Sequence, residues 1–308
     1  MIKRPPPTAP PIFPPRRQGI YTQIGSHPAG ASNVRAVLRL EGVTCARQGR
    51  TVVDRVTLSV AAGQVTLLRG ARGAGKSTLL AIAAAVIRPG AGRVFIADRD
   101  ILALQSHSLP FVRRNIGYLP PEPPLVADDS AIENVMLALA VRGHDVTSAR
   151  TLALDSLRAV GLPATAVDLP VKSLSLGERR LVAVARAVVG APPLIVLDEP
   201  AAGLDADDRE AVAMAMGVAQ SSGSAVICGT AEPSFAALLS ESGADIVELQ
   251  AGRLVGGPRM TVLRGRSETP ALEHNGALQE DQEFPTEIGD DDLAELEDSR
   301  GTFSEGKP

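Results

Sequence analysis

The chain has 308 residues, of which 44% are hydrophobic and 21% are charged, so it can form one large globular domain or two small ones. Only 3% of the residues are aromatic and tryptophan is absent, which argues against nucleic-acid modules that stack bases on aromatic side chains. The two cysteines, Cys45 and Cys228, cannot form a disulfide framework and lack metal-ligand spacing. They indicate a reducing compartment.

The net charge of −4 is distributed unevenly along the chain. Residues 1–36 contain five basic residues, no acidic residue and eight prolines, so we expect a disordered, proline-rich basic arm. Residues 264–308 contain 13 acidic and 4 basic residues and few large apolar ones, so we expect a disordered acidic tail. Residues 37–263 carry 22 charges of each sign, which is not the composition of a nucleic-acid-binding surface.

No stretch of the sequence has the length of a membrane helix. The longest apolar run, residues 79–87, is far shorter than the ~20 residues that cross a bilayer. Prolines interrupt the N-terminal residues before an apolar stretch could form, so we expect no signal peptide.

Residues 37–263 predict alternating strands and helices. The expected strands, in chain order, are 37–45, 52–60, 64–69, a strand-like stretch over 92–119, and then 194–197, 225–229 and 246–249. The expected helices are 76–87, a helical stretch over 131–160, 178–189 and 209–220. This alternation is typical of an α/β fold with a mainly parallel sheet covered by helices.

A glycine-rich segment lies between the expected strand 64–69 and the helix that follows it. Its residues are Gly70, Ala71, Arg72, Gly73, Ala74, Gly75, Lys76, Ser77 and Thr78. The pattern predicts a phosphate-binding loop, because glycines allow successive backbone N–H groups to face the phosphates and the helix N-terminus adds its positive dipole end. Lys76 would place its charge on the phosphates, and the Ser77 hydroxyl would bind Mg²⁺. Lys76 and Ser77 exclude a dinucleotide-binding fingerprint, which needs small apolar residues there.

Two adjacent acidic residues follow a short apolar run at 194–197. A strand buried on both faces would deliver Asp198 and Glu199 at its carboxyl end. We expect Asp198 to hold Mg²⁺ or its water, and Glu199 to orient or deprotonate the attacking water. Strands that end in acidic residues are common, but downstream of a phosphate-binding loop this pair indicates a nucleotide hydrolase.

Two further segments resemble those of ABC-type ATPases. Residues 174–178 (Leu-Ser-Leu-Gly-Glu) are similar to the family's signature motif, Leu-Ser-Gly-Gly followed by Gln or Glu, and residues 200–205 resemble its loop after the catalytic glutamate. The resemblance covers about residues 37–263, with every motif in family order. It implies a P-loop NTPase with an antiparallel β subdomain near residues 37–60 and a helical lid at about 122–176.

The resemblance also implies a function and partners. The protein would be an ATP-binding subunit that hydrolyses ATP with Mg²⁺, as a homodimer or with a paired ATPase subunit. Ser175 and Gly177 would bind the nucleotide of the opposite subunit in a head-to-tail dimer, and Asp205 would be a further nucleotide-binding residue. The resemblance also implies an integral membrane partner subunit and a peripheral position at the cytoplasmic inner face of the cell membrane. No nucleic-acid ligand is expected. Residues 113–117 and the glutamate at 178 are most similar to the FtsE, LolD and MacB group.

Three positions depart from the family pattern. Pro121 replaces the lid glutamine, Ala231 replaces a histidine and Leu176 replaces a signature glycine. Since the side chains of Pro121 and Ala231 cannot hold Mg²⁺ or a phosphate, we expect slow hydrolysis. A nucleotide-dependent scaffold with little hydrolysis and a soluble, non-transport ABC ATPase remain as alternatives. We expect Arg179 and Arg180, after the signature motif, to form a solvated helix face.

Overall fold

The computed structural model describes residues 36–255. The expected acidic tail, and the expected basic arm apart from Ala36, lie outside the described residues. Within the described part of the chain, no helix has the length and apolar character needed to cross a membrane.

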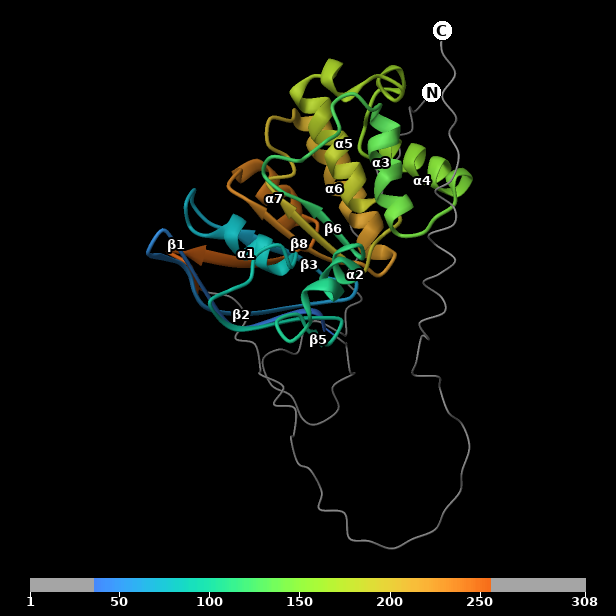
Figure 1. The fold of residues 1–308 in the computed structure, drawn as a ribbon. Coiled ribbons are helices and arrows are strands. Elements are labelled where there is room, and N and C mark those ends of the chain that lie inside the picture. The colour runs from blue at the N-terminus through green and yellow to red at the C-terminus, as the bar shows by residue number, and fades with distance from the viewer. Residues whose placement is uncertain (1–35, 256–308) are drawn as a thin grey trace, which may run out of the picture. The chain divides into compact units, whose positions relative to one another are not determined.

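A six-stranded, mainly parallel sheet forms the centre of the fold (Figure 1). Its strand order is β10-β9-β3-β8-β7-β6. Five strands run parallel, namely β3 (Val65–Arg69), β6 (Ile116–Leu119), β7 (Leu194–Asp198), β8 (Ala225–Thr230) and β9 (Asp245–Gln250), whereas β10 (Arg253–Val255) pairs antiparallel with β9. This confirms the expected α/β class with a mainly parallel sheet. The carboxyl ends of β3, β7 and β8 meet at one edge, where Arg69 pairs with Thr230 and Asp198 pairs with Gly229.

A second, antiparallel sheet has the order β2-β1-β4-β5, and it confirms the expected antiparallel β portion. Its strands are β1 (Ala36–Arg47), β2 (Arg50–Ala61), β4 (Ala91–Ile96) and β5 (Arg99–Asp100). Helix α1 (Lys76–Ala83) lies between this sheet and the parallel one (Figure 1). Its side chains Leu79, Leu80 and Ile82 are fully buried in the core that joins the two sheets.

The opposite face of the parallel sheet is covered by helices. These are α5 (Leu176–Val188), α6 (Ala206–Ser221) and α7 (Pro233–Glu241), and helices α3 (Ala131–Val141) and α4 (Val146–Ala159) pack against α5. Successive side chains of β7 point to opposite faces, so Ile195 and Leu197 join the helical core while Leu194 and Val196 join the core around α1. Strand β7 is therefore buried on both faces, as its apolar sequence predicts.

The segment between β6 and α5 contains α3, α4 and two short 3-10 helices, Ala164–Ala166 and Val171–Ser173 (Figure 1). The connection from β6 is fastened to α3 by Asn134, which is fully buried. Its side chain accepts from the Val126 N–H at 2.8 Å and donates to the Val126 and Ser130 carbonyls at 3.0 Å. These bonds hold the connection that leads from the edge of the sheet into the helical segment.

The sequence interpretation is wrong for part of residues 92–119. After β5 the chain turns through a 3-10 helix, Ser106–Ser108, and the short helix α2 (Leu109–Arg113) before β6. Pro110 stands in the first turn of α2, where its missing N–H costs no hydrogen bond, so an apolar run beginning near a proline formed a helix rather than a strand. Helix α7 and strand β10 were not predicted.

Candidate functional site

The glycine-rich segment forms a tight loop between β3 and α1. A Cβ atom at Gly70 would overlap the backbone oxygen of Leu249, and one at Gly75 (φ 104°) would overlap that of Val52. Gly73 has open space around it but needs a left-handed backbone, with a φ of 79°. The loop therefore requires its glycines for packing and for conformation, as a phosphate-binding loop does.

Lys76 lies across this loop. Its side chain is only 6% exposed, and its ammonium group donates to the carbonyls of Gly70 at 2.8 Å and Ala71 at 3.2 Å. The same nitrogen is 3.8 Å from Oε1 of Glu199, so the structure brings the lysine and the glutamate together. The remaining loop residues vary in exposure: Ala71, Arg72, Gly73 and Ser77 are exposed, Thr78 is half-buried and Ala74 is buried.

Asp198 is the most unusual acidic residue of the site. Its side chain is fully buried, and neither carboxylate oxygen has a hydrogen-bond partner of normal geometry within residues 36–255. Burial raises the pKa of this carboxyl, while the nearby Ser77 hydroxyl and Lys76 oppose that shift. A buried carboxylate without a partner is costly, and a divalent cation offsets that cost. Asp198 and Ser77 thus fit a Mg²⁺ ion.

A metal at this place would need further ligands from outside the chain. The described residues hold no group of three or more His, Cys, Asp or Glu side chains that could bind a metal ion. Phosphate oxygens of a nucleotide in the loop are the hard oxygen ligands that Mg²⁺ prefers, and Mg²⁺ commonly binds through one or two protein ligands plus such oxygens. The donor set therefore fits Mg²⁺ bound together with a nucleotide.

Glu199 is held by the end of β8. Its φ of 48° is unusual for a residue other than glycine, and its N–H donates to the Gly229 carbonyl at 2.8 Å. The carboxylate accepts from the Ala231 N–H at 2.8 and 3.1 Å, and from the Thr230 hydroxyl at 3.0 Å. The side chain of Ala231 is apolar as expected, but its backbone N–H does hold the glutamate, and the sequence gives no signal of this bond.

Thr230 is a second residue that the sequence did not reveal. Its side chain is 1% exposed, and its hydroxyl donates to Glu199 while accepting from the Glu232 N–H at 3.0 Å. Glu232 in turn forms an ion pair with Arg209, at 2.6 Å. The only sequence signal is a hydroxyl residue at the carboxyl end of a strand beside β7, which becomes informative once the strand order is known.

Ser175, Gly177 and Asp205 lie at helix N-termini. Ser175 caps α5 in a reciprocal arrangement with Glu178, with bonds of 2.8 and 3.2 Å, and Asp205 caps α6 by accepting from the Asp208 N–H at 2.9 Å. A Cβ atom at Gly177 would meet only ordinary contacts, so packing within the chain does not demand this glycine. Within residues 36–255, no hydrogen bond or ion pair joins Ser175, Gly177 or Asp205 to the loop at 70–78.

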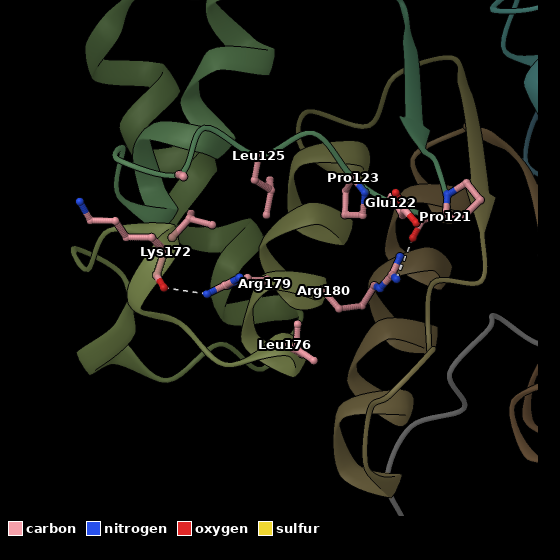
Figure 2. Close-up of a pocket in the computed structure, with 10 residues that line it drawn as sticks. Pro121, Glu122, Pro123, Leu125, Lys172, Leu176, Arg179 and Arg180 are labelled. Carbon is pink, nitrogen blue, oxygen red and sulfur yellow. Dashed lines mark hydrogen bonds between the residues drawn. The ribbon is translucent and has the colours of Figure 1, made fainter.

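A cavity of about 400 Å³ lies between the connection after β6 and the start of α5 (Figure 2). Pro121 and Pro123 line it on one side, and Leu176, Arg179 and Arg180 line it on the other. The expectation that both arginines form a solvated face is wrong. Arg179 donates to the Leu174 and Lys172 carbonyls at 2.9 and 2.6 Å, and half-buried Arg180 donates to the Pro121 carbonyl at 2.9 Å.

Comparison with known proteins gives consistent results. The family model described as ABC transporter matches residues 53–202. The lipoprotein-releasing system ATP-binding protein LolD of Chromohalobacter salexigens is 36% identical over 233 residues, covering 74% of this chain and 96% of LolD. The cell division ATP-binding protein FtsE of Escherichia coli K12 is 36% identical over 170 residues, covering 55% of this chain and 76% of FtsE.

Solved structures show the same similarity. A dimeric ATP-binding cassette in a post-hydrolysis state, bound to ADP and phosphate, matches with a TM-score of 0.65 and 26% sequence identity. The match covers 72% of this chain and 99% of that cassette.

Proposed function

The chain belongs to the ABC transporter family, in its group of ATP-binding subunits that includes LolD and FtsE, and from this premise we propose that it binds Mg·ATP in the loop at 70–78 and hydrolyses it. The observation that carries the proposal is the carboxylate of Asp198, which is buried without a hydrogen-bond partner of normal geometry in the described part of the chain and lies near the Ser77 hydroxyl and the Lys76 ammonium. Burial of this carboxylate without a partner is unfavourable, and a bound cation together with phosphates would offset the cost.

Each residue of the candidate site has a distinct role in the proposed reaction. The N–H groups of the loop and the Lys76 ammonium bind the phosphates, while Ser77 and Asp198 hold Mg²⁺. When bound, Mg²⁺ neutralises the charge that develops on the transferred phosphoryl group. Glu199 accepts a proton from the attacking water, and its orientation is set by Thr230 and the Ala231 amide.

The proposed working unit is a head-to-tail pair of such subunits, formed with a second copy or with a paired ATPase. Ser175 and Gly177 lie at the N-terminus of α5, where backbone N–H groups and the helix dipole favour a phosphate. Between described residues, no hydrogen bond or ion pair joins them to the loop at 70–78. The partner's nucleotide is the proposed ligand of this surface, with Asp205 beside it.

We further propose that an integral membrane subunit receives the work of hydrolysis, and that the protein is peripheral at the cytoplasmic face of the membrane. The names of the relatives support this: LolD belongs to a lipoprotein-releasing system, and FtsE acts in cell division. Purification of the protein from detergent-solubilised membranes tests this part of the proposal, because an integral membrane partner should be recovered with it. Recovery of the protein free of any integral membrane subunit would favour a soluble ABC ATPase.

The rate of hydrolysis separates the main proposal from a nucleotide-dependent scaffold. Pro121 and Ala231 offer no polar side chain, and losing one transition-state donor costs about 10²–10³-fold in rate. We therefore propose slow turnover by the isolated protein. Ala231→His adds a polar side chain at an exposed position and should raise the steady-state rate. Brisk hydrolysis by the unmodified protein would contradict the proposed slow rate.

A further inference from the structure

Arg180 connects two parts of the fold that meet at the nucleotide site. It lies in the second turn of α5, half-buried, and its Nη2 donates to the carbonyl of Pro121 at 2.9 Å (Figure 2). Its Nη1 is buried and has no hydrogen-bond partner within residues 36–255. A buried guanidinium nitrogen without an acceptor is costly, so its position requires an explanation.

The surroundings of Arg180 are acidic. Burial lowers the pKa of its guanidinium, while the charges of the Asp198 and Glu199 carboxylates raise it. The cation therefore interacts with the two side chains that are proposed to bind Mg²⁺ and to orient the attacking water. Pro121, its hydrogen-bonded partner, is the position at which the family has a glutamine. The Arg180 guanidinium is thus bonded to the position at which this chain has an apolar side chain in place of the family's glutamine.

We propose that Arg180 is a positioning residue of the nucleotide site, which fixes the lid connection at Pro121 beside Asp198 and Glu199. This inference rests on the proposed binding of Mg·ATP in the loop at 70–78. Arginine suits the task because its planar guanidinium donates in several directions and stays charged when partly buried.

Arg186 offers a matched control on the same helix. It is also half-buried, burial lowers the pKa of its guanidinium, and its Nη1 donates to the Pro124 carbonyl at 2.9 Å. It therefore ties the same connection to α5, but neither Asp198 nor Glu199 affects its pKa. If substitution of Arg180 has a larger effect on hydrolysis than the same substitution of Arg186, the difference comes from the interaction with the acidic pair and not from the bond to the connection.

The experiment compares Arg180→Gln, Arg180→Lys and Arg186→Gln in the full chain. Binding of a fluorescent ATP analogue is titrated against Mg²⁺, and single-turnover hydrolysis is measured at saturating Mg·ATP. We expect Arg180→Gln to lower the hydrolysis rate at least tenfold while the analogue still binds. Because one positive charge beside the acidic pair is lost, the half-saturating Mg²⁺ concentration should fall about threefold or more. Arg180→Lys keeps the charge and should retain the Mg²⁺ dependence.

The outcomes separate this inference from the proposed function. If the unmodified protein does not bind Mg·ATP, both are overturned. If it binds but Arg180→Gln and Arg186→Gln change rate and Mg²⁺ dependence alike, only the role of Arg180 is overturned. If Arg180→Gln does not fold, as judged by circular dichroism, Arg180→Lys is compared with Arg186→Lys. An equal hydrolysis rate in these two variants would overturn the inference, because only the first loses the guanidinium that ties Pro121 beside the acidic pair.

Discussion

Glu199 depends on a neighbouring strand for its orientation. A non-glycine residue with a positive φ costs on the order of 1–3 kcal/mol and persists where the surroundings over-determine it. Here the surroundings are the Thr230 hydroxyl, the Ala231 amide and the carbonyl of Gly229. Gly229 itself has no room for a side chain, since a Cβ atom would lie 2.7 Å from Leu80 on α1. The carboxylate is thus oriented by Thr230 at the end of β8 and by Ala231, which follows it.

Thr230→Val should reduce hydrolysis with little effect on ATP binding. Valine fills the same buried space, but the hydrogen bond to the Glu199 carboxylate is lost. Bonds to charged groups contribute about 1.5–3 kcal/mol, which corresponds to a turnover about 10- to 100-fold lower. Thr66→Val on β3 is the control, because the Thr66 hydroxyl is buried and has no hydrogen-bond partner among residues 36–255. Equal turnover in the two variants would show that Thr230 does not position Glu199.

Lys76→Ala should abolish measurable Mg·ATP binding, or weaken it at least about tenfold, since the phosphates would be left with backbone N–H groups alone. Lys172→Ala is the control, because Lys172 is an exposed lysine paired with Asp128 at 2.7 Å. Isothermal titration calorimetry with Mg·ATP measures both variants. Normal binding by Lys76→Ala would remove the phosphate-binding assignment of residues 70–78.

At the scale of elements, two helices start in the same way but serve different purposes. Ser130 caps α3 and Ser175 caps α5, each in a reciprocal arrangement with the glutamate three residues later. Helix α3 begins in the connection that Asn134 fastens, and its N-terminus has a role within the chain. Helix α5 begins beside exposed Leu176 and a glycine that the chain's own packing does not need.

Ser130→Ala and Ser175→Ala form a matched pair for this difference. Each should lower the free energy of unfolding by about 1 kcal/mol, because each removes a side-chain cap. Only Ser175→Ala should also weaken ATP-dependent association of two subunits. Urea denaturation measures the first effect, and sedimentation velocity with Mg·ATP measures the second. Association that is unchanged in Ser175→Ala would reduce Ser175 to an ordinary helix cap.

Local signals explain which elements the sequence predicts. An unbroken apolar run predicts strand β7, and the glycine-rich loop predicts that helix α1 follows it. Helices α2 and α7 are short, and both have a proline in the first turn, which a sequence pattern does not distinguish from a break in structure. The half-buried position of Arg180 depends on how α5 packs against the connection after β6, and no local pattern encodes that packing.

At the scale of the whole molecule, the parallel sheet gathers the proposed hydrolytic groups of one nucleotide site at one edge. The loop after β3, the acidic pair after β7 and Thr230 at the end of β8 come from distant parts of the sequence, and the parallel strand order makes them neighbours. The signature residues remain outside this constellation, at the N-terminus of α5. One chain would therefore supply two separate half-sites, which a head-to-tail pair would complete.

Glu199→Gln should accumulate as a dimer in Mg·ATP. The amide cannot accept a proton, and a lost general base lowers turnover by about 10²–10⁴-fold, so the nucleotides that hold the two subunits together would persist. Sedimentation velocity with and without Mg·ATP measures the association, and Glu199→Gln combined with Ser175→Ala is the control. Because Ser175 is proposed to bind the opposite subunit's phosphate, the double variant should stay monomeric under conditions that pair the single one. A monomer of Glu199→Gln at high protein concentration, with ATP bound, would argue against self-pairing and would favour a different ATPase subunit as the partner.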